Sequence, residues 1–129
     1  MAAKTLSETL EEEITSQLVT LQGNPGRDSI RDRIVDTVHP DRSEIFELVQ
    51  HASARMDKIH DVLKQARANG RLYPWIIPAA AALLFEGVFE ACVGVWLMAG
   101  DPADKKELNP AVKEFVRVEV KLYSAMVGA

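Results

Sequence analysis

The sequence has one cysteine and no excess of positive charge, and each shortage excludes a class of protein. Cys92 cannot form a disulfide within the chain, so the fold is not stapled by disulfides and fits a reducing compartment. The net charge of −4 disfavours non-specific binding to nucleic-acid phosphates. The first residues contain no apolar run of the kind that a secretory signal needs. We therefore expect a cytoplasmic protein.

Alternating apolar and polar runs, which would predict β-strands, are also missing, and the hydrophobic period is helical almost throughout. Glycine and proline cluster around residues 23–26, 39–40, 69–74 and 100–102, and they divide the chain into five segments. The second segment, from about Arg27 to Val38, is the shortest. A length of 129 residues fits one domain. The sequence thus predicts a single all-α domain over residues 1–129, a five-helix bundle with a central, strongly apolar fourth helix.

The first and third segments carry the simplest helical patterns. The first begins with Thr5 and Glu8, spaced as a capping box, and ends at Gly23. The third begins with a similar pair at Asp41 and closes at Gly70. Each has one apolar stripe, formed in the first by Leu6, Leu10, Ile14, Leu18 and Leu21, and in the third by Ile45, Val49, Ala52, Met56, Ile59, Leu63 and Ala66.

The fourth segment, from about Trp75 to Ala99, is apolar on two opposite sides. Glu86 and Glu90 lie one turn apart on one side, which they share with Ala79, Ala82, Leu83, Val93 and Leu97. We expect the core to lie against the other side, made of Ile77, Leu84, Val88, Ala91 and Val95. The fifth segment begins at Asn109 and Pro110, a cap followed by proline at the first helical position. Its expected inward residues are Val112, Phe115, Leu122 and Met126.

Residues 76–98 are long enough to cross a bilayer. Glu86 and Glu90 argue against a membrane partner, because an acidic residue at mid-depth costs about 2.5–3.5 kcal/mol on insertion scales. A helix this apolar is typical of the buried member of a soluble bundle, wrapped by amphipathic neighbours.

The fifth segment has a basic stripe of Lys113, Arg117 and Lys121. An antiparallel hairpin of the last two helices would set Glu90 near Arg117 and Glu86 near Lys121, but only by turning the apolar side of the fifth helix outward. Either arrangement leaves an apolar strip without an internal partner, and a second copy of the chain would cover it. The candidate interface residues are Leu83, Glu86, Gly87, Glu90, Ala91, Val93, Leu97, Arg117 and Lys121, of which Gly87 and Ala91 allow close helix approach.

Catalytic and metal-binding patterns are weak. A carboxylate metal site would draw on Asp57 and His60, or on Glu47 and His51, but the heptad frame of the third helix turns most of them to solvent. Cys92 lies in an apolar helix without a basic neighbour, and we expect it to pack as a small hydrophobic residue. We expect no metal and no cofactor.

The pattern favours a non-enzymatic interaction module, a homo-oligomeric adaptor, regulator or assembly component that could also bind another protein. One alternative is a small-molecule sensor or enzyme with a pocket beside the fourth helix, lined by Trp75, Phe85, Phe89 and Trp96. Another is a helix-turn-helix DNA-binding regulator built on residues 27–33 and the helix that follows. The carboxylates of Asp41 and Glu44 at the start of that helix would repel phosphate, so nucleic acid is not an expected partner.

Overall fold

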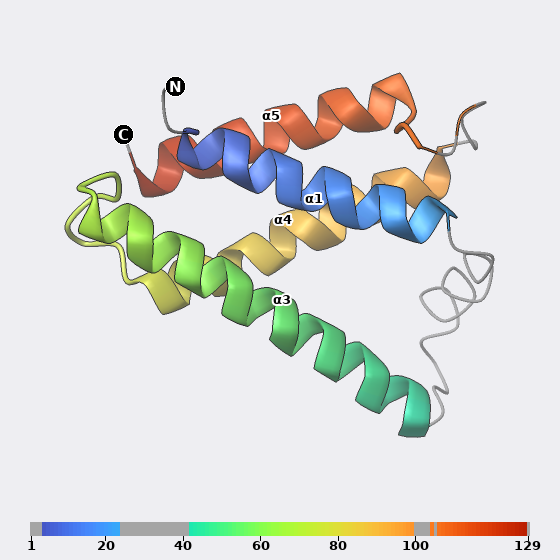
Figure 1. The fold of residues 1–129 in the computed structure, drawn as a ribbon, viewed down its shortest axis with the longest axis horizontal. Coiled ribbons are helices and arrows are strands. Elements are labelled where there is room, and N and C mark those ends of the chain that lie inside the picture. Colours follow the sequence, from blue (N-terminus) through green and yellow to red (C-terminus); the bar gives the residue numbers. More distant parts are fainter. Residues whose placement is uncertain (1–3, 24–41, 100–103, 105, 129) are drawn as a thin grey trace.

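The computed structural model describes residues 4–23, 42–99, 104 and 106–128. These residues form four helices, labelled in Figure 1 as α1 (Leu6–Gly23), α3 (Arg42–Ala68), α4 (Pro78–Met98) and α5 (Pro110–Val127). The predicted all-α class is confirmed. The short helix predicted between Arg27 and Val38 lies outside the described residues, as do the side chains of residues 42–52.

Helix α4 lies at the centre, where it contacts α1, α3 and α5. Helix α1 lies in front of α4 and α5 in Figure 1, and α3 runs down the other side of α4. The predicted stripe of α1 is confirmed, since Leu10, Ile14 and Leu18 are fully buried. The described end of the α3 stripe is confirmed as well, with Ile59, Leu63 and Ala66 in the same core.

Local hydrogen bonds explain where the helices begin and end. The Glu8 amide donates to Thr5 Oγ1 at 3.1 Å, as the capping pair predicts. The Ala111 amide donates to the side chain of Asn109, which caps α5. Gly70 adopts a φ of 71° after α3, and the amide of Arg71 donates to the carbonyl of Ala66. This is a Schellman ending, in which glycine accepts the left-handed conformation without steric cost.

The turn between α3 and α4 is tied to the end of α5. The amide of Tyr73 donates to the carbonyl of Val127 at 3.0 Å, and Leu72 forms a single antiparallel bridge with Gly128. A Cβ atom at Gly128 would lie 2.1 Å from the carbonyl oxygen of Arg71. Glycine is therefore required at this position by the close approach of the two backbones.

The expected inward side of α5 is wrong for three of its four residues. Val112 is buried, but Phe115 is only half-buried, and Leu122 and Met126 are exposed. The buried side is the neighbouring stripe of Val112, Val116, Val120, Tyr123 and Val127. Both stripes are apolar, and the one with compact valines packs against α1 and α4 while Tyr123 finds a buried hydrogen-bond acceptor.

The expected core side of α4 is also wrong. Ile77, Leu84 and Ala91 are exposed, and Val88 and Val95 are half-buried. The core takes a third side of the helix, which holds the aromatic residues and is made of Ala81, Ala82, Phe85, Phe89, Cys92 and Trp96. Because aromatic side chains bury the largest apolar area, their side faces inward although the aliphatic side has the same helical spacing.

Candidate functional site

The most unusual feature of the described surface is its large exposed hydrophobic residues. Eight are exposed, and all lie on α4, on α5 or in the turn that precedes α4: Trp75, Ile77, Leu83, Leu84, Met98, Val118, Leu122 and Met126. We call this surface the apolar face. Its large side chains present roughly 800 Å² when each fully exposed one is counted at ~150–180 Å². The largest apolar patch on a typical monomer is about 300–600 Å².

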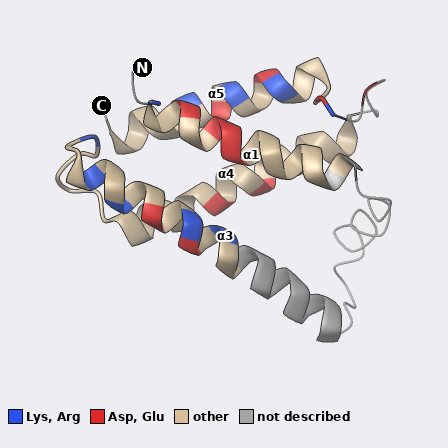
Figure 2. Cartoon of the chain, in the orientation of Figure 1, with Lys and Arg blue, Asp and Glu red and all other residues tan. Residues whose placement is uncertain are grey.

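The α4 part of the apolar face carries almost no charge. Glu86 and Glu90 are the only ionisable residues of α4 besides Cys92. In Figure 2 the charged residues of α4 are accordingly all acidic. Small residues separate the large ones, and a Cβ atom added at Gly87 or Gly94 would meet nothing within 4 Å. The small side chains on the outer side of α4 would allow another helix to approach it closely.

The α4 and α5 parts of the apolar face lie on two helices that pack against each other. A hollow of about 150 Å³ joins the first turns of α4 to the end of α5. Trp75, Ile77 and Leu84 line it from the α4 side, and Val127 lines it from α5. Trp75 is 72% exposed and stacks on Tyr73 with ring centroids 4.7 Å apart, so its indole is held at the edge of the face.

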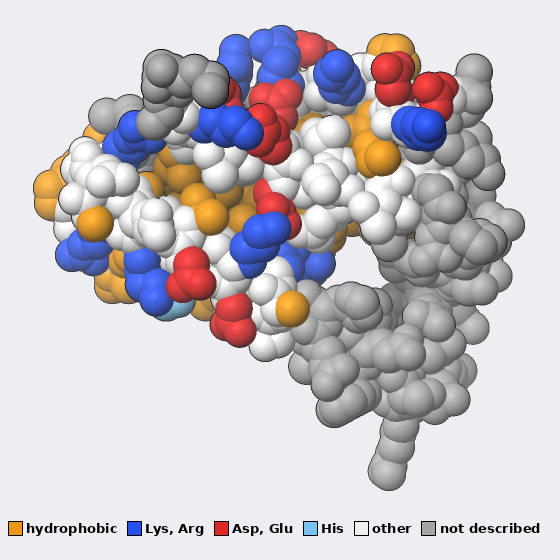
Figure 3. All heavy atoms as spheres, viewed as in Figure 1, with side chains coloured by type: hydrophobic (Ala, Val, Ile, Leu, Met, Phe, Trp, Pro, Cys, Tyr) orange, Lys and Arg blue, Asp and Glu red, His pale blue; other side chains and the backbone are white. Residues whose placement is uncertain are grey.

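The face formed by α1 and α3 has a different character. In Figure 3 its described part is covered by acidic and basic side chains side by side, with apolar atoms visible mainly in the groove between the two helices. Lys4 pairs there with Glu12, and Lys58 pairs with Glu13. This surface is a solvated one, stabilised by mixed charge, and it needs no partner.

Glu86 has a partner that the sequence did not indicate. Both carboxylate oxygens accept hydrogen bonds from Arg55 of α3, each at 2.7 Å, and the two side chains are only 14–15% exposed. The guanidinium also lies 4.0 Å from the ring centroid of Phe89. Glu86 thus pairs with α3, and not with Lys121 as one of the two hairpin arrangements would have placed it. Arg55 occupies heptad position g of the α3 stripe, a position that borders an apolar seam, and this signal could have identified it.

The structure separates the remaining candidate interface residues into two groups. Leu83, Gly87, Glu90 and Ala91 are exposed on α4, and Lys121 is exposed on α5. The others are partly covered by the chain itself: Glu86, Val93, Leu97 and Arg117.

Arg117 bonds to Glu114, one turn earlier on α5, through two hydrogen bonds. These bonds, together with the charge of Glu11 on α1, raise the pKa of Arg117. The same bonds lower the pKa of the Glu114 carboxyl. Arg117 is thus part of an ion pair inside α5.

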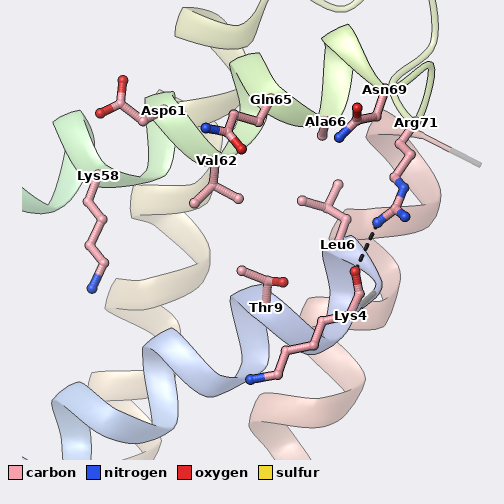
Figure 4. A pocket seen from close by; sticks show the side chains of 10 residues that line it. All are labelled: Lys4, Leu6, Thr9, Lys58, Asp61, Val62, Gln65, Ala66, Asn69 and Arg71. Atoms are coloured by element: carbon pink, nitrogen blue, oxygen red, sulfur yellow. Dashed lines mark hydrogen bonds between the residues drawn. The ribbon is translucent and has the colours of Figure 1, made fainter. Parts of the chain in front are cut away.

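A second concavity lies between α1 and α3, and Figure 4 shows its lining. It measures about 420 Å³, with Leu6, Val62 and Ala66 among its apolar residues. Its basic groups are already engaged: Lys4 and Lys58 in the ion pairs named above, and Arg71 in a 2.9 Å hydrogen bond to the carbonyl of Lys4. These groups hold the helices together and do not converge on a common point.

The residues expected for catalysis or a pocket serve the core. Phe85, Phe89 and Trp96 are buried, and only Trp75 reaches the surface. Burial, with a contribution from the charge of Glu119, raises the pKa of the Cys92 thiol to about 12. This thiol is protonated at neutral pH and is a poor nucleophile. Among the described residues, no cluster of three or more metal-ligating side chains is found.

Sequence reasoning missed the buried polar link at the far end of the bundle. The side chain of Gln22 donates to the carbonyl of Glu107 at 2.6 Å and accepts from the indole of Trp96 at 3.2 Å. It joins α1, α4 and the start of α5. Gln22 follows Leu21 directly and lies one helical turn after Leu18, so it borders the apolar stripe of α1. Nothing in that spacing predicts that an amide side chain is needed there.

By length and composition, α4 is the single described helix that could cross a membrane. In this fold its buried side packs on three charged, amphipathic helices, and Glu86 is held by Arg55. That packing is typical of the central helix of a bundle.

No protein-family model matches this chain, and no curated protein or solved structure matches it either. Function must therefore be argued from the geometry above, in which the apolar face is the strongest candidate site.

Proposed function

We propose that this protein is a non-enzymatic interaction module that forms a homodimer through the apolar face, and that it serves in the cytoplasm as an adaptor, regulator or assembly component. The observation that carries the proposal is the exposure of α4. Most of this apolar helix is wrapped on one side only, and Ile77, Leu84 and Met98 face outward. Such a surface is stable in water when another molecule covers it.

The size of the apolar face supports a specific interface. A stable protein–protein contact takes about 800 Å² from each partner, and the exposed large side chains of the face offer roughly that area. The face also has the composition of an interface centre, because it combines a tryptophan and two methionines with few charges. Closed twofold dimers are the commonest oligomers, so a second copy is the occupant we propose.

The two concavities give less support to an enzyme or sensor. The hollow beside α4 is lined by apolar residues, and the groove between α1 and α3 has its charges engaged within the chain. An active site requires polar groups that converge on a substrate. Binding of a second copy to the apolar face requires only that the two surfaces fit each other in shape and charge.

The direct test is the mass of the chain in solution, measured by light scattering across a concentration series. We expect two chains per particle at micromolar concentration. Leu84→Lys places a charge at an exposed position of α4 and should yield a monomer that keeps its helical circular dichroism. The matched control is Ser53→Lys, an exposed position on α3 outside the apolar face, which should remain dimeric. A wild-type mass of one chain at these concentrations would refute the proposal.

A further inference from the structure

The apolar face runs between two edges of opposite charge. Glu86 points to Arg55 of α3, so this side of α4 borders α3, and Glu90 lies one turn further along the same edge, exposed. On the opposite edge, Arg117 lies within reach of the charge of Glu11 on α1, and Lys121 follows one turn later, exposed. Arg55 pairs with Glu86 and Glu114 pairs with Arg117, so the exposed charges that distinguish the two edges are Glu90 on α4 and Lys121 on α5. We call these the acidic edge and the basic edge.

The two edges are in register along the helices. Tyr123 donates a hydrogen bond to the carbonyl of Ala81 at 2.6 Å and lies edge-on to Phe85, with ring centroids 5.6 Å apart. Because α4 and α5 run antiparallel, counting away from these contacts at ~1.5 Å per residue sets Glu90 level with the α5 turn around Arg117.

The two halves of the apolar face also differ in shape. On α4 the outward side is dominated by small residues between Leu84 and Met98, where added Cβ atoms would find open space. On α5 the outward side carries the larger Val118, Leu122 and Met126. The small outward side chains in the middle of α4 leave room for the larger outward side chains of a second copy's α5.

Two twofold axes could place one apolar face on another. An axis perpendicular to the helices stacks α4 on the partner's α4, and it brings Glu90 to the partner's acidic edge and Lys121 to the partner's basic edge. An axis parallel to the helices stacks α4 on the partner's α5, and it brings each acidic edge to a basic one. Only the second arrangement pairs opposite charges, and it also places the larger outward side chains of α5 over the small ones in the middle of α4.

We infer that the homodimer of the proposed function, on which this inference rests, has its twofold axis along the helices. In it, α5 of each copy packs antiparallel on the other copy's α4, and Glu90 lies against the partner's Lys121. The result is a four-helix layer in which two symmetric clusters of charge fix the register.

Thiol cross-linking tests this geometry. A chain with Glu90→Cys is mixed with a chain with Lys121→Cys, treated with a short bis-maleimide, and analysed by mass spectrometry. We expect cross-linked pairs that contain one chain of each kind, while each variant alone stays uncross-linked. Cross-linking of Glu90→Cys chains with one another would overturn the inferred axis and leave the proposed homodimer standing. A wild-type chain that is monomeric by light scattering would overturn both.

Charge reversal gives a second readout. Glu90→Lys should weaken the dimer by about tenfold, and Lys121→Glu should do the same, since each sets like charges together at the rim. Combining the two in one chain should recover most of the lost affinity. The matched control is Lys106→Glu, an exposed residue outside the apolar face, which should change the affinity little. A double variant weaker than either single one would show that like edges meet and would overturn the inference.

Discussion

The inner and outer sides of α4 are both apolar, but the inner side is buried and the outer side is exposed to solvent. Phe85, Cys92 and Trp96 on the inner side are at most 2% exposed, while Ile77, Leu84 and Met98 on the outer side are more than half exposed. Hydropathy and helical period do not separate the two sides. Among the described residues, the other helices cover only the inner side of α4, and the outer side stays exposed.

The largest expected difference between the two sides is in the reactivity of a cysteine thiol on each side. Burial raises the pKa of Cys92 to about 12, whereas a cysteine introduced by Ala91→Cys would be exposed. At pH 8 the thiolate population of Cys92 should be about a thousandfold smaller than that of an ordinary thiol with a pKa near 8.5. Labelling with iodoacetamide, followed by mass spectrometry, measures the ratio in dilute Ala91→Cys protein.

The same variant reports on association. Labelling at position 91 should slow as the protein concentration rises, because the partner covers the outer side, while Cys92 should stay unreactive until the chain unfolds. Equal labelling of both cysteines in the folded protein would contradict the burial of the inner side.

The second contrast concerns stability. Phe85→Ala should lower the free energy of unfolding by about 3–5 kcal/mol, since it removes a fully buried aromatic ring and leaves a cavity. Leu84→Ala, one residue away on the outer side, should cost the isolated chain less than about 1 kcal/mol. Urea unfolding at a protein concentration low enough to keep the chain monomeric measures both. Similar costs for the two variants would mean that the outer side is also packed within one chain.

A third contrast separates the two glutamates. Glu86→Gln breaks a bidentate ion pair whose members are 14–15% exposed, and we expect a loss of about 1–3 kcal/mol from the folded chain. Glu90→Gln removes an exposed charge and should leave the unfolding free energy almost unchanged.

A double-mutant cycle isolates the pair. Replacing both partners together, with Arg55→Met and Glu86→Leu, should cost less than Glu86→Gln alone, because no charge is then left buried. Additive effects of the two replacements would show that Arg55 and Glu86 act independently.

The smallest effect is expected at the mixed-charge surface of α1 and α3. Burial tends to raise the pKa of Glu13, but hydrogen bonds from Lys58 and Gln17 more than offset it, and the pKa lies below the ordinary value of 4.5. Stability from this group is present above the unfolded-state pKa and is lost as the pH falls through the lower folded pKa. Glu13→Gln should therefore flatten the acid side of the stability profile slightly, as measured by urea unfolding between pH 7 and pH 3. A steeper profile in the variant would contradict the sign.

Whether the sequence predicted the buried side of a helix depended on how many apolar stripes that helix has. Helix α1 has one stripe, which the sequence placed correctly, and Gly70 correctly predicted the end of α3. Helices α4 and α5 have two apolar sides each, and periodicity cannot choose between them. The choice depends on tertiary packing, in which the aromatic side of α4 and the valine side of α5 fill the core.

The apolar character of the fourth helix on more than one side could be predicted from residues 76–98, but its contacts could not. The partner of Glu86 was not predicted, because Arg55 lies 31 residues away and its approach depends on how α3 crosses α4. The exposure of Leu122 and Met126 was not predicted, because periodicity could not show which apolar side of α5 faces the core.

The most direct test of the central claim is sedimentation equilibrium of the unaltered chain at increasing concentration. If the outer side of α4 is covered by a second copy, the mass should rise from one chain to two and then stop, because a twofold interface closes on itself. A mass that remains that of one chain well above micromolar concentration would contradict the account.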